Sequence, residues 1–352
     1  MIAPGETIGI LGGGQLGRMT AMAAERLGYR CHVFAPEPDS VAAEVSAKFT
    51  CAGWDDREAL ARFAGDCAVI TYEFENVPVG PVSTLAPVPV LPHWRALETA
   101  QDRLVEKVFV ASLGGTPAPF AEVDSDADLA AAIARIGAPG ILKTRREGYD
   151  GKGQWRIASL EEADRLDLPT VPLIYESFVT FFAEFSVILC RSAGGDICFW
   201  DSAENVHEGG ILSRCSVPAS DRVQTLVPDA RALAAKVAEA LDYVGVLTLE
   251  FFATEQGPVF NEMAPRVHNS GHWTIEGAVT CQFENHVRAI CDLPLGDTAL
   301  AGKGAEMRNL IGEDAASWAE VLSDPTAHLH LYGKAEARPG RKMGHVTLVL
   351  TD

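Results

Sequence analysis

Glu250 and Glu262 are the two residues whose spacing points most directly to chemistry. Each lies in an apolar run, at 247–253 and 258–263, and the polar segment TEQG between the runs predicts a β-hairpin. Facing residues of an antiparallel pair have residue numbers with a constant sum, so a turn centred on Gln256 places the two glutamates opposite each other. Like charges directly opposite each other destabilise a sheet. A shared proton or a bound divalent cation would relieve that repulsion.

Magnesium suits such a pair, because it prefers oxygen ligands and binds through one or two carboxylates together with substrate phosphates. Asn261 lies beside Glu262 and could fill a further position. The alternative is an exposed, solvated face, since an error of one residue in the turn would separate the carboxylates.

A cationic segment, APRVHNSGH, follows the hairpin at once. Arg266 and His268 are two residues apart, so they share a face if the chain is extended. We expect them to lie in one cleft with the two carboxylates. Asn269 and Gly271 argue against a helical zinc pair of His268 and His272.

A glycine-rich segment, LKTRREGYDGKGQ, follows a predicted strand that ends at Lys143. Its glycines permit a mobile loop, and Tyr149, Asp150 and Lys152 give the loop chemical groups. A basic loop that closes over phosphates would have this composition. An exposed hairpin turn would explain DGKG equally well.

A second glycine-rich segment, GGGQLG at 12–17, fits the G-x-G-x-x-G pattern between a strand and a helix. Such a turn lets backbone N–H groups approach a phosphate. A dinucleotide site would also need an acid at the end of the second strand, where Ala35 and Pro36 stand. The pattern therefore leaves nicotinamide binding and a different use of the turn both open.

A third basic segment, GKAEARPGRKMGH, lies near the end of the sequence. Pro339 and Gly340 favour a type II turn, which brings the Cα atoms of Arg338 and Arg341 within about 7 Å. On a chain of net charge −19, such a cluster suits a dianionic phosphate. The alternative is a solvated turn with ordinary surface charges.

The elements that must position these residues alternate along the chain. Thr99 is a candidate N-cap for a helix that stops at Gly114. We expect a parallel βαβ sheet at the start of the chain and further strands and helices after the proline-rich segment APVPVLP. Predicted strands are TIGIL, CHVFA, DCAVITYEF, GILKT, LIYESFV, AEFSVILCR, VGVLTLEFFA and HVTLVLT, and predicted helices include DADLAAAIARIG and DARALAAKVAEAL.

Length and composition limit the classes of protein. A chain of 352 residues predicts two or three domains. A net charge of −19 argues against nucleic acid and anionic lipid as general partners. We expect no signal peptide and no membrane span, and the 8 cysteines, none in a C-x-x-C pair, predict reduced thiols and a cytoplasmic location.

The middle of the chain resembles an ATP-grasp domain. Lys143, the GYDGKGQ loop, the YESFV strand and the pair LEFF…FNEMAPR occur in the order of that family. With GGGQLGRM, TYEFENV, NEMAPRVHNSGHWT and RPGRKMGHV, the chain resembles the 5-(carboxyamino)imidazole ribonucleotide synthetases of purine biosynthesis over almost its whole length.

That resemblance implies an α/β ATP-grasp fold with three parts: an N-terminal pre-ATP-grasp, Rossmann-like βαβ domain at 1–95, the ATP-grasp domain at 96–295 and a small β-rich domain at 296–352. It implies that ATP phosphorylates bicarbonate to carboxyphosphate, which then carboxylates the amine of 5-aminoimidazole ribonucleotide. It also implies Mg²⁺ or Mn²⁺ as cofactor and a homodimer. The rivals are another ATP-grasp ligase, such as a biotin carboxylase or a formate-using glycinamide ribonucleotide enzyme, a nicotinamide dehydrogenase, and a silent nucleotide-binding module.

The resemblance further assigns roles by position. The metal ligands are Glu250 and Glu262, and the catalytic residues are Arg266, His268, Lys152 and Asp150. The substrate-binding residues are Gln15, Glu73, Tyr149, Lys334, Arg338 and Arg341. The ATP-binding residues are Arg103, Lys143, Gly148, Tyr149, Asp150, Gly151, Lys152, Gly153, Gln154, Glu176, Ser177, Phe178, Val179, Glu184, His207, Asn261 and Glu262.

Overall fold

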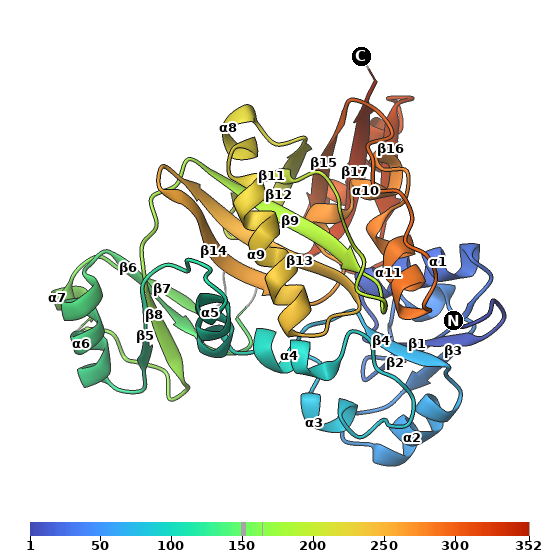
Figure 1. Cartoon of the computed structure of the whole chain (residues 1–352), viewed down its shortest axis with the longest axis horizontal. Helices are drawn as coiled ribbons and strands as arrows, with labels where there is room; N and C mark the ends of the chain where they lie inside the picture. The colour runs from blue at the N-terminus through green and yellow to red at the C-terminus, as the bar shows by residue number, and fades with distance from the viewer. Residues whose placement is uncertain (149–152, 164, 352) are drawn as a thin grey trace.

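The computed structural model describes residues 1–148, 153–163 and 165–351. The strands of the described chain form three sheets (Figure 1). A parallel sheet holds the N-terminal residues, a small antiparallel sheet lies at the opposite side, and a large antiparallel sheet lies between them.

The N-terminal sheet is parallel, with strand order β3-β2-β1-β4, as the alternation of strands and helices predicted. Its first strand is fully buried because Ile8, Ile10 and Leu11 pack between helices on both faces. The prediction missed β3, whose residues are only half-buried and carry little hydrophobic signal. The elements are β1 (Thr7–Leu11), α1 (Gln15–Arg26), β2 (Arg30–Ala35), η1 (Ala43–Val45), β3 (Lys48–Cys51), α2 (Arg57–Gly65), β4 (Val69–Tyr72) and α3 (Val79–Val82).

The connecting helices differ from the prediction at Thr99. Two helices, α4 (Trp94–Ala100) and α5 (Arg103–Ser112), stand where one was expected to begin. Thr99 lies within α4, and its hydroxyl donates to the carbonyl of Arg95 at 2.9 Å. The N-cap of α5 is Asp102, whose carboxylate accepts from the backbone N–H of Leu104 at 3.0 Å. The candidate N-cap was therefore wrong, because an aspartate three residues later binds the free N–H groups at the helix start.

The small sheet has the order β5-β8-β6-β7, with antiparallel neighbours. Helices α6 and α7 lie on its outer side (Figure 1). The elements are β5 (Phe120–Val123), α6 (Asp126–Ile136), β6 (Gly140–Thr144), β7 (Gln154–Ile157), α7 (Leu160–Ala163) and β8 (Leu173–Ser177).

The large sheet has nine strands in the order β14-β13-β9-β11-β12-β15-β17-β16, with β10 on β9, and all its pairs are antiparallel. The sheet crosses the proposed boundary at 295, since β12 pairs with β15. The strands are β9 (Ala183–Arg191), β10 (Ile197–Phe199), β11 (Ala203–Glu208), β12 (Ile211–Val217), β13 (Gly245–Thr254), β14 (Gly257–Ala264), β15 (Gly304–Ile311), β16 (Ala327–Leu331) and β17 (Lys342–Leu350).

Helix α9 covers one face of that sheet, where Ala234 and Val237 are fully buried against β9 and β13 (Figure 1). Burial of apolar surface of this kind stabilises by about 25 cal/mol per Å². Helix α11 packs on the other side with α1, so the large sheet and the N-terminal sheet share a core. The remaining helices are α8 (Asp221–Gln224), α9 (Val227–Ala240), η2 (Asn269–Gly271), α10 (Thr274–Gly277), α11 (Gln282–Ile290), η3 (Gly312–Ser317) and α12 (Trp318–Val321).

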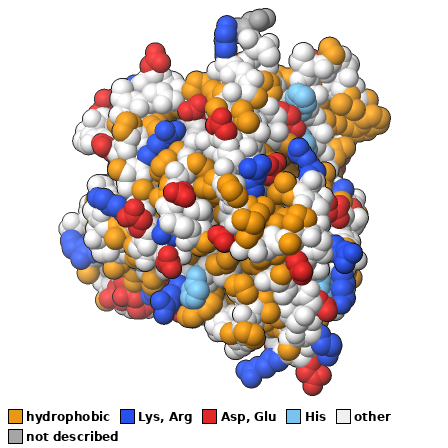
Figure 2. Space-filling model, turned by 45° about the vertical axis from the view of Figure 1, so that its right-hand side comes forward, with side chains coloured by type: hydrophobic (Ala, Val, Ile, Leu, Met, Phe, Trp, Pro, Cys, Tyr) orange, Lys and Arg blue, Asp and Glu red, His pale blue; other side chains and the backbone are white. Residues whose placement is uncertain are grey.

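Acidic, basic and hydrophobic side chains are interspersed on the face shown in Figure 2. The net charge of −19 is therefore not gathered into a single acidic patch on that face. Within the described residues, every helix is too short or too polar to cross a bilayer.

Candidate functional site

Glu250 and Glu262 are direct cross-strand partners in β13 and β14, as predicted. The uniform register assumed for the hairpin is nevertheless wrong. Thr254 pairs with Gly257 across a tighter turn, and the register shifts by one residue beyond Glu250. The shift leaves Asn261 as an extra residue in β14, that is, as a β-bulge. The bulge brings Glu262 back opposite Glu250.

The two carboxylates have different electrostatic surroundings. Burial and the nearby charge of Glu262 raise the pKa of Glu250 to about 7. Burial also opposes the charge of Glu262, but the Arg103 guanidinium, whose Nη1 donates to Oε2 at 3.0 Å, outweighs it and lowers the pKa of Glu262. The pair therefore resists carrying two negative charges, which is the physical signature of a cation site or a shared proton.

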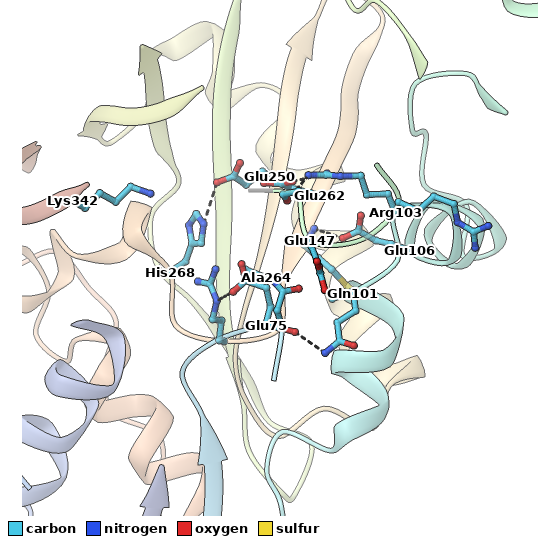
Figure 3. A pocket seen from close by; sticks show the side chains of 16 residues that line it. Glu75, Gln101, Arg103, Glu106, Glu147, Glu250, Glu262, Ala264, His268 and Lys342 are labelled. Atoms are coloured by element: carbon cyan, nitrogen blue, oxygen red, sulfur yellow. Dashed lines mark hydrogen bonds and ion pairs between the residues drawn. The ribbon is translucent and has the colours of Figure 1, made fainter. Parts of the chain in front are cut away.

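The pair lies in a pocket with both residues of the cationic segment that follows the hairpin (Figure 3). The His268 ring points at Glu250, with Nε2 at 3.4 Å from Oε1. Arg266 forms a close ion pair with Glu75, at the end of the N-terminal sheet. The predicted cleft is thus present, and it joins the large sheet to the N-terminal sheet. The pocket is lined by Glu75, Asn76, Ala100, Gln101, Arg103, Glu106, Arg145, Glu147, Gly148, Glu250, Glu262, Met263, Ala264, Arg266, His268 and Lys342.

Lys143 and Glu176 form a buried ion pair on neighbouring strands of the small sheet, with Nζ at 2.9 Å from Oε2. Lys107 approaches the same oxygen to 3.4 Å. Burial works against the charge of Glu176, but Lys107 and Lys143 lower its pKa to about 2. The other oxygen, Oε1, is buried and makes no hydrogen bond to the described residues, so it can accept one from a ligand. Ser177, Phe178 and Val179 continue this strand and are more exposed.

Glu184 and His207 lie on adjacent strands β9 and β11. The His207 ring atom Nδ1 is 2.6 Å from the Glu184 carboxylate. Burial opposes the charged ring, but Glu184 and then Glu250 raise the pKa of His207. The raised pKa favours the charged form of His207, whose interaction with Glu250 reaches the carboxylate pair.

The glycine-rich loop is described only at its ends. The carbonyl of Gly148 accepts from Arg103 Nη2 at 2.9 Å. Gly153 has a φ of +65°, and a Cβ there would lie 2.6 Å from the Thr144 hydroxyl, so glycine is required. Gln154 is the partner of Lys143 in β7 and β6. The remaining predicted loop residues, Tyr149, Asp150, Gly151 and Lys152, lie outside the described residues.

The N-terminal glycine turn holds a carboxylate of the protein itself. The backbone N–H groups of Gly14 and Gly17 donate to Glu73 at 3.0 and 3.3 Å. A Cβ on Gly12 would lie 2.7 Å from the same side chain. Burial raises the pKa of Glu73, against these hydrogen bonds. Gln15 is the first residue of α1, beside this contact. The N–H groups that would bind a dinucleotide phosphate are thus engaged by Glu73.

The predicted type II turn is present: Arg341 N–H donates to the Arg338 carbonyl at 3.0 Å, and Gly340 has a φ of +78°. Arg338 is paired with Glu336 through Nε at 2.8 Å and through Nη2. Arg341 Nη1 donates to the backbone carbonyl of Glu336 at 3.0 Å, and no carboxylate of the described residues pairs with this arginine. The two arginines therefore differ: a carboxylate neutralises the charge of Arg338, whereas Arg341 contacts a backbone carbonyl.

Lys334 Nζ donates to the Lys342 carbonyl at 2.7 Å. Lys342 in turn lines the pocket of Glu250. The basic segment therefore reaches the edge of the cleft that holds the carboxylate pair through Lys342.

Several site residues were missed by the sequence reasoning. Glu106 and Lys107 lie on α5 with Arg103, at the i+3 and i+4 positions, so helical spacing could have placed them on the same face. Glu75 lies two residues after Glu73. Lys342 carried no signal beyond its place in a basic turn.

The residues fit a hard divalent cation only together with a bound molecule. The described parts of the chain contain no cluster of three or more His, Cys, Asp or Glu side chains placed to hold a metal. Glu250 and Glu262 do, however, repel each other, as the raised pKa of Glu250 shows. Two such carboxylates are the protein ligands that magnesium uses when phosphates supply the others.

Comparison with known proteins gives matches over most of the chain. Residues 5–101 match the ribonucleotide synthetase preATP-grasp domain, 108–283 the ATP-grasp domain, and 305–352 the phosphoribosylaminoimidazole carboxylase C-terminal domain. An N5-carboxyaminoimidazole ribonucleotide synthase of Brucella melitensis is 50% identical, covering 99% of this chain and 97% of the relative. A relative of that name from Pseudomonas aeruginosa is 44% identical over 98% and 95%.

Solved structures similar to this chain carry the same family name as these relatives. The N5-carboxyaminoimidazole ribonucleotide synthetase of Thermus thermophilus has a TM-score of 0.91 at 48% identity, covering 98% of this chain and 94% of that one. An Aspergillus clavatus N5-carboxyaminoimidazole synthase, solved with ADP and 5-aminoimidazole ribonucleotide, has a TM-score of 0.90 at 32% identity over 98% and 94%.

Proposed function

The chain belongs to the family of N5-carboxyaminoimidazole ribonucleotide synthases, and we propose that the cleft around Glu250 and Glu262 is where it carries out that family's reaction. The protein is an ATP-dependent ligase of purine biosynthesis that carboxylates 5-aminoimidazole ribonucleotide. A bicarbonate oxygen attacks the γ-phosphorus of ATP and ADP leaves. We propose that the carboxyl group then passes from carboxyphosphate to the exocyclic amine, either by direct attack or as released CO₂, while phosphate leaves and the nitrogen loses a proton.

The observation that carries the assignment of the site is the register of β13 and β14, which sets Glu250 opposite Glu262 in a pocket. We propose that the two carboxylates hold Mg²⁺ or Mn²⁺ with the ATP phosphates. The ion would offset the negative charge that gathers when bicarbonate meets the γ-phosphate. The raised pKa of Glu250 supports this, because a cation would stabilise the second negative charge that the two carboxylates resist.

The nucleotide would lie between the small sheet and the large one. We propose that Lys143, Arg103 and His207 contact the phosphates and that Glu184 contacts the ribose. Adenine would meet the end of β8, where the free Glu176 Oε1 can accept from its amino group. We propose as the ATP-binding set Arg103, Lys143, Gly148 to Gln154, Glu176, Ser177, Phe178, Val179, Glu184, His207, Asn261 and Glu262.

Bicarbonate would bind at Arg266 and His268. Arg266 is partly buried, and its ion pair with Glu75 outweighs the effect of burial and raises its pKa, so the guanidinium stays charged. A cation fixed beside the two metal-binding carboxylates can bind an anionic substrate. It can also stabilise the negative charge that develops on the transferred phosphate. Asp150 and Lys152, also proposed as catalytic, belong to the loop beyond the described residues.

The ribonucleotide would lie between the N-terminal glycine turn and the C-terminal basic turn. Glu73 and Gln15 are proposed for the imidazole, with Tyr149 from the loop. Lys334, Arg338 and Arg341 are proposed for the 5′-phosphate, because arginine holds a dianionic phosphate with two charge-assisted bonds.

We also propose that the protein is a homodimer and lies in the cytoplasm. We place the boundaries between its three domains near residues 95 and 295. Sedimentation of the purified protein at several concentrations tests the assembly: a mass of one chain of 37.6 kDa at all of them contradicts it.

The function is tested by measuring ADP release while substrates are omitted one at a time. We expect release to require both bicarbonate and 5-aminoimidazole ribonucleotide. Release supported equally by biotin, or by formate with glycinamide ribonucleotide, would assign the chain to another ATP-grasp ligase.

A further inference from the structure

The metal-binding hairpin ends in an edge strand. Among the described residues, β14 has β13 as its one neighbouring strand in the large sheet, and on its other side it makes a single bridge, between Phe260 and Pro117. The outward N–H and C=O groups of an edge strand need other partners when they are buried. Along residues 261–263 these partners come from one helix, α5, which packs against β14 (Figure 1).

Three side chains of α5 contact three successive residues of β14. Lys107 Nζ donates to the carbonyl of Asn261 at 2.9 Å. Arg103 Nη1 donates to the carboxylate of Glu262 at 3.0 Å. The N–H of Met263 donates to Glu106 Oε1 at 2.7 Å. The three charged residues share one helical face and are 9%, 2% and 1% exposed in the order Arg103, Glu106, Lys107.

These contacts bracket the β-bulge. Without the bulge, the register set at the turn would place Asn261 opposite Glu250 and turn Glu262 to the other face. The bulge breaks the ladder locally, so its carbonyl depends on the Lys107 ammonium. Burying these ionisable groups carries a cost that their hydrogen bonds and ion pairs offset.

Lys107 also joins the two sheets. Its ammonium lies 3.4 Å from Glu176 Oε2 in β8, while it donates to the bulge in β14. A single charge thus links the acid proposed for adenine to the strand proposed for the metal.

We infer that Lys107 and Glu106 are positioning residues that hold the β14 bulge, and through it hold Glu262 opposite Glu250 for the cation. The inference rests on the proposed metal role of the carboxylate pair. Groups that orient metal ligands typically contribute roughly 10- to 100-fold to metal affinity.

The test is Mn²⁺ binding in the presence of ADP, measured from the electron paramagnetic resonance signal of free Mn²⁺. We expect Lys107→Met to weaken Mn²⁺ binding roughly 10- to 100-fold. Lys236→Met, on the exposed face of α9, is the control, since it makes the same substitution away from the site. An equal loss in both variants, or wild-type affinity in Lys107→Met, would overturn the inference.

The Glu106 variants decide the matter even if Lys107→Met does not fold. Glu106→Gln keeps an oxygen that accepts from Met263 N–H, so Mn²⁺ affinity should stay within about threefold of wild type, while Glu106→Leu should lose about tenfold or more. Amide hydrogen exchange in the 261–263 segment should be faster in Glu106→Leu than in Glu106→Gln. Equal affinities and equal exchange in the two variants would overturn the inference.

Glu262→Gln distinguishes the metal role of the carboxylate pair from the positioning role of the α5 residues. If that variant keeps wild-type Mn²⁺ affinity, the metal role of the pair is wrong. If it loses the affinity and the α5 variants do not, only the positioning role is wrong.

Discussion

Nε2 of His268 lies 3.4 Å from Oε1 of Glu250, while Nδ1 of the same ring accepts a hydrogen bond from the backbone N–H of Ser270 at 3.3 Å. A ring whose Nδ1 accepts carries its proton on Nε2, so the N–H is directed at the carboxylate. Burial, with Arg266 nearby, lowers the pKa of His268 well below its usual range. The neutral ring adds no net charge, so the positive charge that faces the pair at hydrogen-bond distance is that of Arg103 on Glu262.

Changing Glu262 to Gln should abolish most activity. The amide keeps the shape of the side chain but removes the charge that a cation needs, and electrostatic groups of this kind contribute on the order of 100-fold or more to turnover. The measurement is ADP release at saturating substrates, with circular dichroism as the control for folding. Near-normal turnover by a folded variant would contradict the metal assignment.

Arg341→Ala should raise the KM for 5-aminoimidazole ribonucleotide and leave the KM for ATP nearly unchanged. A charge-assisted phosphate contact is worth on the order of 1.5–3 kcal/mol, which corresponds to roughly 10- to 150-fold. Arg338→Ala is the matched comparison from the same turn. We expect a smaller rise, because Glu336 already compensates the Arg338 guanidinium. A rise in the KM for ATP instead would move the phosphate site elsewhere.

The protein should not bind NADPH, because Glu73 engages the N–H groups of Gly14 and Gly17 that a dinucleotide phosphate would need. Fluorescence titration of the wild-type protein measures this. Glu73→Ala should also lower the free energy of unfolding by about 1–3 kcal/mol, since two N–H groups lose their acceptor. Saturable NADPH binding by the wild-type protein would contradict this prediction and support the hypothesis that the glycine turn binds a nicotinamide dinucleotide.

His286 should make the fold sensitive to acid. Its ring joins β4 to β13: Nε2 lies 2.8 Å from the Thr71 hydroxyl, and Nδ1 accepts from Val246 N–H at 3.2 Å. Burial lowers the pKa of His286 from 6.5 to about 4. The unfolded chain binds a proton below pH 6.5 and the folded chain does not, so stability present above pH 6.5 is lost as pH falls towards 4.

That loss amounts to roughly 3 kcal/mol for this residue. Urea unfolding at pH 7.5 and pH 5 measures it. In His286→Gln, which keeps an acceptor and a donor but cannot titrate, the difference between the two pH values should be smaller by about 2 kcal/mol. An identical pH dependence in both proteins would show that His286 does not contribute.

The sequence by itself determined the elements whose patterns are local. Side-chain periodicity predicts the strands β1 and β13 from their apolar runs. Backbone sterics predict the glycine turn before α1 and the turn at Pro339 and Gly340. The pairing of Glu250 with Glu262 could be predicted because a hairpin is a local structure.

Only the tertiary structure decided why that pairing holds. The turn is one residue tighter than expected, and the Asn261 bulge corrects the register because α5, from more than 150 residues earlier in the chain, supplies its partners. The same holds for Glu73 in the glycine turn and Glu75 on Arg266. Contacts between distant segments depend on how whole sheets pack, and no local pattern of charge or hydrophobicity encodes which buried cation will meet which carboxylate.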